Sequence, residues 1–435
     1  MSEILFSLYS WPQAIIHIDG DAFFTSCEEA IHPELRGKPI ITGGERGIVA
    51  CASYPAKRLG IKRGVPLHEA RALCPELVIL PSDYETYSLF SRRMFNIIRR
   101  FTPQVEEYSI DEAFADITGM RRVHHASYDT ITLRIKSEIQ RELGITVSAG
   151  LSLTKVLAKV ASKHNKPDGF TAIPGRLIAR YLKYLPVEKI WGIGHATASY
   201  LEKMKVSTAL EFARLPERII KERFTKPGVE TWRELRGESV YPVSPEEKST
   251  YASISKTKTF SPPTSDREYL FAHLLRNLES ACIKARRYAL APRKIIPFLK
   301  KNNFDTAGCE AKLTRPSVYP LELSPLLQEL FDQLYEEKEI YRSTGIVLID
   351  LVPDAPIQYS LFEDPLKAEK IRQLYEAADI LSGKYGKHTL HLGGSHPIEV
   401  FGKGRRGAPT VREQTRMYGE TKRKHLGLPI LHVKT

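Results

Sequence analysis

Two acidic segments, each beside a stretch typical of a β-strand, constrain the fold of this chain more than any other feature. Asp111 and Glu112 stand side by side within residues 108–116, whose alternating apolar residues predict a strand beside a tight hairpin turn. Far upstream, the apolar residues 15–18 lead directly into the Asp-Gly-Asp sequence at 19–21. Ionised carboxylates at the end of a buried strand need a partner of opposite charge. If the two strand ends meet, four acids converge, and their hard oxygen ligands suit Mg²⁺.

Length and composition indicate a protein of several domains. A chain of 435 residues is too long for one hydrophobic core and predicts three or four domains. Its longest apolar runs are too short to span a bilayer, so we expect no membrane contact. The stretch 1–11 lacks the basic start and the small residues of a signal peptide. The five scattered cysteines form no CxxC pair, which indicates reduced thiols and a cytoplasmic location.

Charge gives the first indication of a partner. The chain carries 64 Lys and Arg residues against 51 Asp and Glu residues, a formal net charge of +13. Such an excess favours a polyanion, nucleic acid above all. A basic surface that is merely solvated is the alternative.

The first third of the chain predicts an α+β domain with acids on one edge of its sheet. A strand and turn over 14–24 precede short elements broken by Gly and Pro, which we interpret as a small inserted subdomain that ends near residue 84. The elements expected after it are a helix over 83–100, the acidic hairpin, a helix over 130–143 and a strand over 145–151. This order is typical of a ferredoxin-like sheet.

Lysines recur along the next predicted helix. The helix over 154–164 is expected to bury its apolar residues and to present Lys155, Lys159 and Lys163 as a stripe. The stop signals Lys-Pro-Asp-Gly follow it.

Residues 174–242 are expected to be helical throughout, and they contain a Gly-x-Gly turn at Gly192 and Gly194. Backbone N–H groups at such a turn can hold a DNA phosphate without regard to sequence. A plain turn between two helices is the alternative.

A separate domain follows a polar linker at 243–250. Residues 251–353 predict the order β-α-β-β-α-β. In the first strand, Lys256 and Lys258 alternate with hydroxyl residues, so the lysines share one face. Lysines suit DNA phosphates, whereas an edge strand protected by lysines is the alternative.

Five motifs in the chain, in order and at familiar distances, point to one family. They are HIDGDAFFTSCEEA (17–30), ACASYPAKRLGI (50–61), YSIDEAFADITG (108–119), LSLTKVLAKVASKHNKPDG (151–169) and IWGIGHATASYLEKM (190–204). Together they closely resemble the Y family, the translesion DNA polymerases, with the bacterial DNA polymerase IV branch nearest. The resemblance implies an α+β right-hand polymerase. Its domains are expected at 1–22 and 85–173 (ferredoxin-like palm), 23–84 (small fingers), 174–242 (helical thumb), 251–353 (little finger) and 354–435 (C-terminal tail).

The resemblance also implies which residues carry the reaction. Asp19, Asp111 and Glu112 are the expected catalytic acids that hold two Mg²⁺ ions, and the Gly20 carbonyl is a further expected ligand. Such a pair of ions suits an in-line displacement at phosphorus. For Asp21, a metal ligand and a structural hydrogen-bonding residue stay open as alternatives.

Four more positions match residues that contact the incoming dNTP. Phe24 falls where the family has an aromatic steric gate that leaves no room for a 2′-OH. Tyr54 and Lys166 match the triphosphate-binding tyrosine and lysine. Lys57 stands where an arginine is usual, and a lysine cannot make the bidentate fork of an arginine. We expect that Lys57 still contacts the triphosphate.

The tail contains a short motif of its own. Gln358, Leu361 and Phe362 resemble the Q-x-x-L-F peptide by which bacterial polymerases bind the sliding clamp, and two apolar anchors suit a small groove. The segment 383–435 resembles the tail of related error-prone repair polymerases and receives no assigned role. We expect a monomer that acts on primed DNA at the nucleoid, in a bacterial cytoplasm.

The expected function is template-directed DNA synthesis of low fidelity, because no part of the chain resembles a proofreading exonuclease. A nucleotidyl cyclase is one alternative, since it also places two metal-bound carboxylates on a ferredoxin-like sheet. A catalytically inactive, clamp-bound scaffold is the other, although such a protein would lose its carboxylates.

Overall fold

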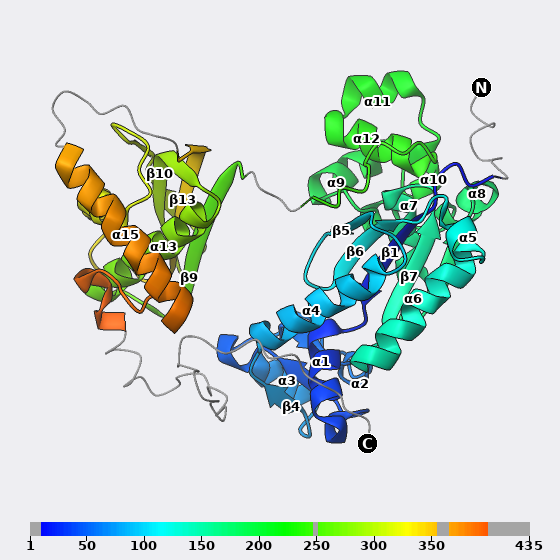
Figure 1. Ribbon diagram of the computed structural model, residues 1–435, viewed down its shortest axis with the longest axis horizontal. Coiled ribbons are helices and arrows are strands. Elements are labelled where there is room, and N and C mark those ends of the chain that lie inside the picture. Colours follow the sequence, from blue (N-terminus) through cyan, green and yellow to red (C-terminus); the bar gives the residue numbers. More distant parts are fainter. Residues whose placement is uncertain (1–9, 247–250, 355–364, 399–435) are drawn as a thin grey trace. The chain divides into compact units, whose positions relative to one another are not determined.

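The computed structural model describes residues 10–246, 251–354 and 365–398 (Figure 1). The chain forms two compact units, and the main division between them falls within the 243–250 stretch expected to be a linker. Among the helices of the described ranges, none is long and apolar enough to cross a membrane.

The first unit is built around a five-stranded sheet in the order β5-β6-β1-β7-β8. Strand β1 runs antiparallel to both of its neighbours, and β8 runs parallel to β7. The strands are β1 (Ile15–Gly20), β5 (Val105–Glu107), β6 (Glu112–Asp116), β7 (Val147–Ser152) and β8 (Phe170–Ile173). All six residues of β1 are buried, as expected for a central strand covered on both faces.

Helices cover both faces of this sheet (Figure 1). Helices α4 (Tyr84–Arg99) and α6 (Tyr128–Leu143) pack in one core with Ile16 and Ile18, while α7 (Lys155–His164) covers the opposite face. Because successive residues of a strand point to opposite faces, the odd-numbered residues of β1 lie on the α7 side. The last acid of β1 therefore faces α7.

Helix α7 lies unusually close to the sheet at Gly150. A Cβ atom at Gly150 would lie 2.1 Å from the Ala158 carbonyl oxygen and 2.2 Å from the Ser162 nitrogen, so any larger residue would push the helix away. The close approach also changes the predicted lysine stripe. Lys155 and Lys159 are buried against the sheet, and the expectation that they face solvent is wrong.

Two smaller parts complete the first unit. Residues 33–80 form a three-stranded sheet in the order β3-β2-β4 with its own core. Its elements are β2 (Ile40–Thr42), β3 (Cys51–Ala52), α2 (Tyr54–Arg58), α3 (Leu67–Leu73) and β4 (Val78–Leu80), after α1 (Phe23–Ile31). The helical region that the sequence predicts contains α8 (Ile178–Leu182), α9 (His195–Lys203), α10 (Ala209–Ala213), α11 (Glu217–Arg223) and α12 (Lys226–Leu235). A further short helix is α5 (Met120–Val123).

The second unit confirms the predicted β-α-β-β-α-β order. Its sheet runs β11-β10-β13-β9, with β12 also paired to β10, and α13 and α14 pack on one face. The elements are β9 (Ser253–Thr264), α13 (Arg267–Arg287), β10 (Leu290–Lys301), β11 (Thr306–Gly308), β12 (Ala311–Lys312), α14 (Pro320–Leu334) and β13 (Tyr341–Pro353). Strand β9 is an edge strand, because β13 is its single described neighbour in the sheet.

The C-terminal segment packs on this second unit. Helix α15 (Pro365–Tyr385) follows the prediction of a helix from 365, and a short 3-10 helix, η6 (Gly393–Ser395), follows it. Arg286 of α13 holds α15 through two contacts of 2.7 Å with the carboxylate of Asp379. Residues 365–398 therefore belong to the fold of the second unit.

Candidate active site

The acids meet because of the register between β1 and β6. Asp19 lies directly opposite Glu112 in the antiparallel pair, and His17 lies opposite Phe114. Residues opposite each other share a face, so both carboxylates lie on the α7 side at the end of the strands. The register thus brings together two acids that are 93 positions apart in the sequence.

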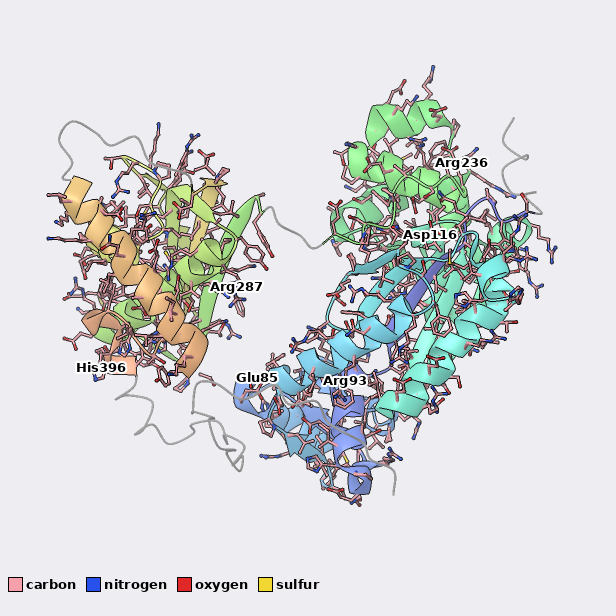
Figure 2. The ribbon with its side chains drawn as sticks, in the orientation of Figure 1. Glu85, Arg93, Asp116, Arg236, Arg287 and His396 are labelled. Carbon is pink, nitrogen blue, oxygen red and sulfur yellow. The ribbon has the colours of Figure 1, made fainter. Side chains whose placement is uncertain are left out.

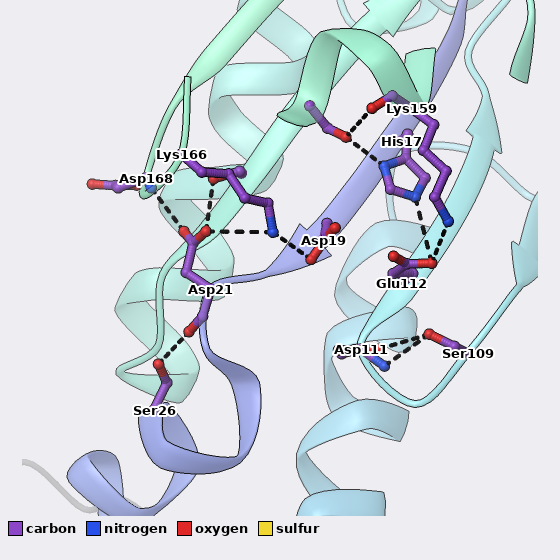
Figure 3. Close-up of polar contacts among 12 residues, drawn as sticks. His17, Asp19, Asp21, Ser26, Ser109, Asp111, Glu112, Lys159, Lys166 and Asp168 are labelled. Carbon is purple, nitrogen blue, oxygen red and sulfur yellow. Dashed lines mark hydrogen bonds and ion pairs between the residues drawn. The ribbon is translucent and has the colours of Figure 1, made fainter. Parts of the chain in front are cut away.

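The hairpin turn places Asp111 beside them. The Gly20 amide donates a hydrogen bond of 2.8 Å to the Asp111 carbonyl, which ties the end of β1 to the turn. The Ser109 hydroxyl donates to Asp111 Oδ1 at 2.6 Å and orients its carboxylate. Figure 3 shows Asp19, Asp111 and Glu112 around one region at the end of the strands. Backbone register and these contacts bring the three acids to the same end of the sheet, and their role as metal ligands stays a prediction.

Lys166 is paired with the first acid. Its Nζ lies 2.5 Å from Asp19 Oδ1 and 3.8 Å from Asp21 Oδ1. Burial raises the pKa of Asp19 to about 6 against the opposing effect of Lys166, and the nearby charges of Glu112 and Asp111 add to the rise. The site thus concentrates negative charge in a poorly solvated place, where a cation is stabilised.

Glu112 has partners that the sequence did not reveal. Lys159 Nζ lies 2.7 Å from Glu112 Oε2, and His17 Nε2 lies 3.9 Å from the same oxygen. Burial tends to raise the pKa of Glu112, but His17 and Lys159 together lower it to about 2. Burial in turn lowers the pKa of His17 to about 4. The Ser162 hydroxyl lies 2.7 Å from His17 Nδ1 and fixes the ring.

The donor set fits divalent cations in its chemistry. Carboxylate oxygens with a nearby backbone carbonyl are the ligands that Mg²⁺ prefers. Within the described ranges, however, no group of three or more His, Cys, Asp or Glu side chains is gathered closely enough to hold an ion. Lys166, Lys159 and Ser109 each hold one of the three acids in this arrangement. These contacts must loosen before the acids can share a cation.

Asp21 is held as a structural residue. It is buried, and its carboxylate accepts hydrogen bonds of 2.7 Å from the Ser148 hydroxyl and 2.7 Å from the Asp168 amide. The Tyr54 hydroxyl is a third and longer donor, at 3.4 Å. These donors use both carboxylate oxygens. Of the two alternatives for Asp21, the hydrogen-bonding role is the one that its contacts support.

Of the residues expected at the nucleotide, Lys166 contacts Asp19 and Tyr54 contacts Asp21. Phe24, in the first turn of α1, is half-buried and stacks on Tyr87 with ring centroids 4.5 Å apart. The hydroxyl of Tyr87 donates to Glu28 at 2.7 Å, so the stacking partner is fixed. Phe23, by contrast, is a core residue. Tyr54 and Lys57 both lie on α2, and Lys57 Nζ contacts the ring of Tyr54 at 4.3 Å from its centroid.

The Gly-x-Gly turn contacts the catalytic hairpin through Trp191. The indole Nε1 donates to the hydroxyl of Tyr108 at 3.0 Å, three residues before Asp111. Gly192 has a positive φ of 96°, and a Cβ there would lie 2.8 Å from Thr231 Oγ1, so glycine is required. Gly194 is the N-cap of α9, as a phosphate-binding turn requires.

Two further sets of predicted residues do not belong to the first unit as the structure describes it. Lys256 and Lys258 are on β9 of the second unit, and the clamp motif 358–362 lies outside the described residues. Along β9 the two lysines alternate with the hydroxyl residues and share their face with Ile254 and Phe260, which are buried against the helices. The lysines therefore lie at the edge of the helix-covered face, and the hydroxyl residues lie on the open face.

Sequence reasoning missed several supporting residues of the site. His17, Ser148, Ser162 and the pairing of Lys159 with Glu112 all depend on contacts between segments that are far apart in the chain. One signal was present: His17 precedes Asp19 by two residues in a strand, so the two side chains had to share a face.

Comparisons with known proteins identify the family of the chain. The model of the impB/mucB/samB family matches residues 18–163, and that of its C-terminal domain matches residues 251–361. DNA polymerase IV of Desulfatibacillum aliphaticivorans is 33% identical over 379 residues, which cover 86% of this chain and 95% of the relative. The chain belongs to the Y family of DNA polymerases.

Further Y-family matches support the same conclusion. DNA polymerase IV of Moorella thermoacetica is 33% identical over 87% of this chain and 95% of its own. A chimaeric Y-family DNA polymerase has a TM-score of 0.66 at 25% identity, over 78% of this chain and 99% of that chain. A DinB structure from Sulfolobus solfataricus, at 24% identity and a TM-score of 0.50, shares the fold.

Membership of the Y family settles the class of the protein. It is a DNA-directed DNA polymerase of the translesion type with an α+β right-hand fold, and it uses divalent metal ions. None of the relatives named above is a nucleotidyl cyclase or an inactive scaffold.

Proposed function

We propose that this chain adds dNMP from dNTP to a primer 3′-OH, with release of pyrophosphate, at the site formed by Asp19, Asp111 and Glu112. One observation carries the proposal: the direct pairing of Asp19 with Glu112 across β1 and β6, beside the turn that holds Asp111. Three acids on the edge of a covered sheet are costly without a cation, and the reaction needs one.

The three acids and the Gly20 carbonyl would hold two Mg²⁺ ions. Bound there, such ions lower the pKa of the 3′-OH and neutralise the triphosphate and the leaving pyrophosphate. Asp21 would stay outside the coordination and keep the loop at Asp168 in place through its hydrogen bond to that amide. Lys159 and His17 would position Glu112 from the α7 side.

The nucleotide would lie between the acids and the small three-stranded sheet. Tyr54, Lys57 and Lys166 would contact its triphosphate, since lysine and tyrosine donors suit phosphate oxygens. Phe24 would lie under the sugar. Stacking on Tyr87 fixes the plane of its ring, and a fixed ring excludes a 2′-OH more sharply than a mobile side chain.

DNA would be held by parts on both units. We assign the palm, fingers, thumb and little finger to the ranges that the sequence predicts. Gly192 and Gly194 would present backbone N–H groups to a phosphate, and Lys256 and Lys258 would add charge contacts.

The segment at 358–362 would bind a sliding clamp. We expect a Leu361→Ala/Phe362→Ala protein to lose capture by immobilised clamp while it still extends a primer. Unchanged capture would overturn this assignment. The polymerase would act as a monomer at the bacterial nucleoid. A sedimentation experiment that finds a stable dimer would contradict the monomeric state.

Primer extension tests the proposed reaction. Wild-type protein, with a primed template, Mg²⁺ and dNTPs, should extend the primer, and the Asp111→Ala/Glu112→Ala protein should not. Glu217→Ala/Glu222→Ala removes the same charge from α11 and serves as the matched control, which should extend normally. No extension by wild type, with primed DNA still bound, would overturn the proposal and favour an inactive scaffold.

A further inference from the structure

Four positive side chains gather on the second unit, which we call the basic cluster: Lys256, Lys284, Arg287 and Lys387. Lys284 and Arg287 lie in the last turn of α13, which packs against β9 and its Lys256. Ser280, one turn before Lys284, is on the same face of the helix. Its hydroxyl lies 3.0 Å from Nε2 of His388, which brings the C-terminal segment, and with it the preceding Lys387, to this face.

Aromatic contacts connect the strand to the end of the helix. Lys284 Nζ lies 4.3 Å from the ring centroid of Tyr251, just before β9, and the Tyr251 and Tyr288 rings lie 4.7 Å apart. The positive charges are close enough to affect one another. Burial lowers the pKa of Lys256, and the charges of Lys387, Lys284 and Arg287 lower it further.

The charges of the basic cluster are not neutralised within the described residues. No described carboxylate forms an ion pair with any of the four, whereas the adjacent Arg286 is fully engaged by Asp379 in holding α15. Arg287 and Lys387 are exposed, and Figure 2 shows Arg287 on the second unit. Like charges held together in this way destabilise the fold and favour binding of a polyanion.

We propose that the basic cluster binds the phosphate backbone of DNA, so that the C-terminal segment is a DNA-holding part of this polymerase. The inference rests on the proposed function, since primed DNA is the polyanion that a polymerase meets. It goes beyond the family match, because Lys387 lies after residue 361, where that match ends. Lysine and arginine contacts to phosphates hold DNA without regard to its sequence.

The test measures binding of the full-length protein to a primed duplex over a range of KCl concentrations. Lys284→Gln, Arg287→Gln and Lys387→Gln together should raise Kd at least about tenfold and reduce the slope of log Kd against log salt by about 2 to 3. Lys387→Gln alone should reduce the slope by about 1. Lys387→Arg should bind like wild type, because the charge is retained.

Lys370→Gln is the matched control, since it removes one exposed lysine from the same C-terminal segment outside the basic cluster, and its slope should equal that of wild type. The same Kd and slope for the triple variant and wild type would overturn the inference, and binding of the cluster to an acidic protein or lipid would then be the next hypothesis. Primer extension by wild type is measured in parallel. If wild type extends the primer but the triple variant has the same salt slope as wild type, this inference alone is rejected. If wild type does not extend the primer, the proposed function is rejected.

Discussion

Lys166 Nζ lies 2.5 Å from Asp19 Oδ1, so the lysine expected to bind the triphosphate neutralises an acid expected to bind metal. On the other side of the site, Lys159 holds Glu112 in the same way. Both pairs keep the carboxylates compensated in a place where isolated negative charge is costly. When divalent cations and a triphosphate bind, the cations would pair with the carboxylates in place of the lysines. Lys166 would then move from a carboxylate oxygen to a phosphate oxygen.

Replacing Lys166 should weaken nucleotide binding. In Lys166→Ala we expect the KM for dNTP to rise about 10-fold to 100-fold, since a charged hydrogen bond contributes about 1.5–3 kcal/mol. Steady-state incorporation of one nucleotide measures the effect. Lys62→Ala, which removes an exposed lysine between α2 and α3, is the control and should leave the KM unchanged. An unaltered KM in Lys166→Ala would exclude contact with the triphosphate.

Replacing Lys159 should affect the chemical step. Lys159→Met leaves Glu112 half-buried beside a neutral side chain, so the carboxylate loses the contact that positions it. We expect kcat to fall at least about tenfold with little change in the KM for dNTP, and the free energy of unfolding to fall by about 3 kcal/mol. Urea unfolding and single-nucleotide kinetics measure the two effects.

Lys163→Met is the control for this variant, because Lys163 is one turn further along α7 and exposed. Because Lys163 makes no direct contact with Glu112, this variant should leave stability unchanged and lower kcat far less than Lys159→Met does. A normal kcat in Lys159→Met would show that Glu112 needs no support from α7.

The contrast between Lys159 and Lys163 shows which features of α7 could be predicted from the sequence and which could not. The periodicity of α7 correctly predicted a helix with a lysine every four residues. It could not predict that Gly150 lets the helix approach the sheet so closely that Lys159 reaches Glu112, 47 positions away. Lysine-rich helical faces are usually solvated, and here the partner acid comes from another strand. Such a pairing depends on tertiary structure alone.

The acids themselves were predictable for the opposite reason. Asp19 ends an apolar strand, and Asp111 and Glu112 begin another, so local pattern alone places each at a strand end. The role of Asp21 was not decided by that pattern. Its hydrogen bonds come from Ser148 and from the Asp168 amide, residues brought near by the pairing of β1 with β7 and by the loop before β8.

Phe24 should control the choice between dNTP and NTP. Phe24→Ala opens the space beside Tyr87. We therefore expect the ratio of NTP to dNTP incorporation to rise about 10-fold to 100-fold. Primer extension with each nucleotide measures this ratio. Phe23→Leu is the neighbouring control. It should lower the free energy of unfolding by about 1–2 kcal/mol and still reject NTP.

Lys57 should contribute less than Lys166 but in the same direction. Its Nζ lies over the ring of Tyr54, whose hydroxyl contacts Asp21, so Lys57→Ala should raise the KM for dNTP about three-fold to tenfold. Lys57→Arg should restore or improve wild-type affinity, because an arginine can contact two phosphate oxygens at once. Equal KM values for Lys57→Ala and wild type would contradict the assignment.

Glu279 should decide whether the C-terminal segment stays docked. Its buried carboxylate accepts from the Leu392 amide at 2.6 Å and from the Ser395 hydroxyl at 3.0 Å. Glu279→Ala leaves the Leu392 amide without its acceptor and the Ser395 hydroxyl with the Leu392 carbonyl alone, so we expect the second unit to lose about 1–3 kcal/mol and residues 386–396 to exchange amide hydrogens faster. Glu329→Ala removes an exposed glutamate of α14 and should change neither stability nor amide exchange.

If docking of this segment also positions Lys387, then Glu279→Ala should reduce the salt slope of DNA binding by about 1, as Lys387→Gln does. Faster exchange with an unchanged slope would separate the two roles and leave the segment a purely structural one.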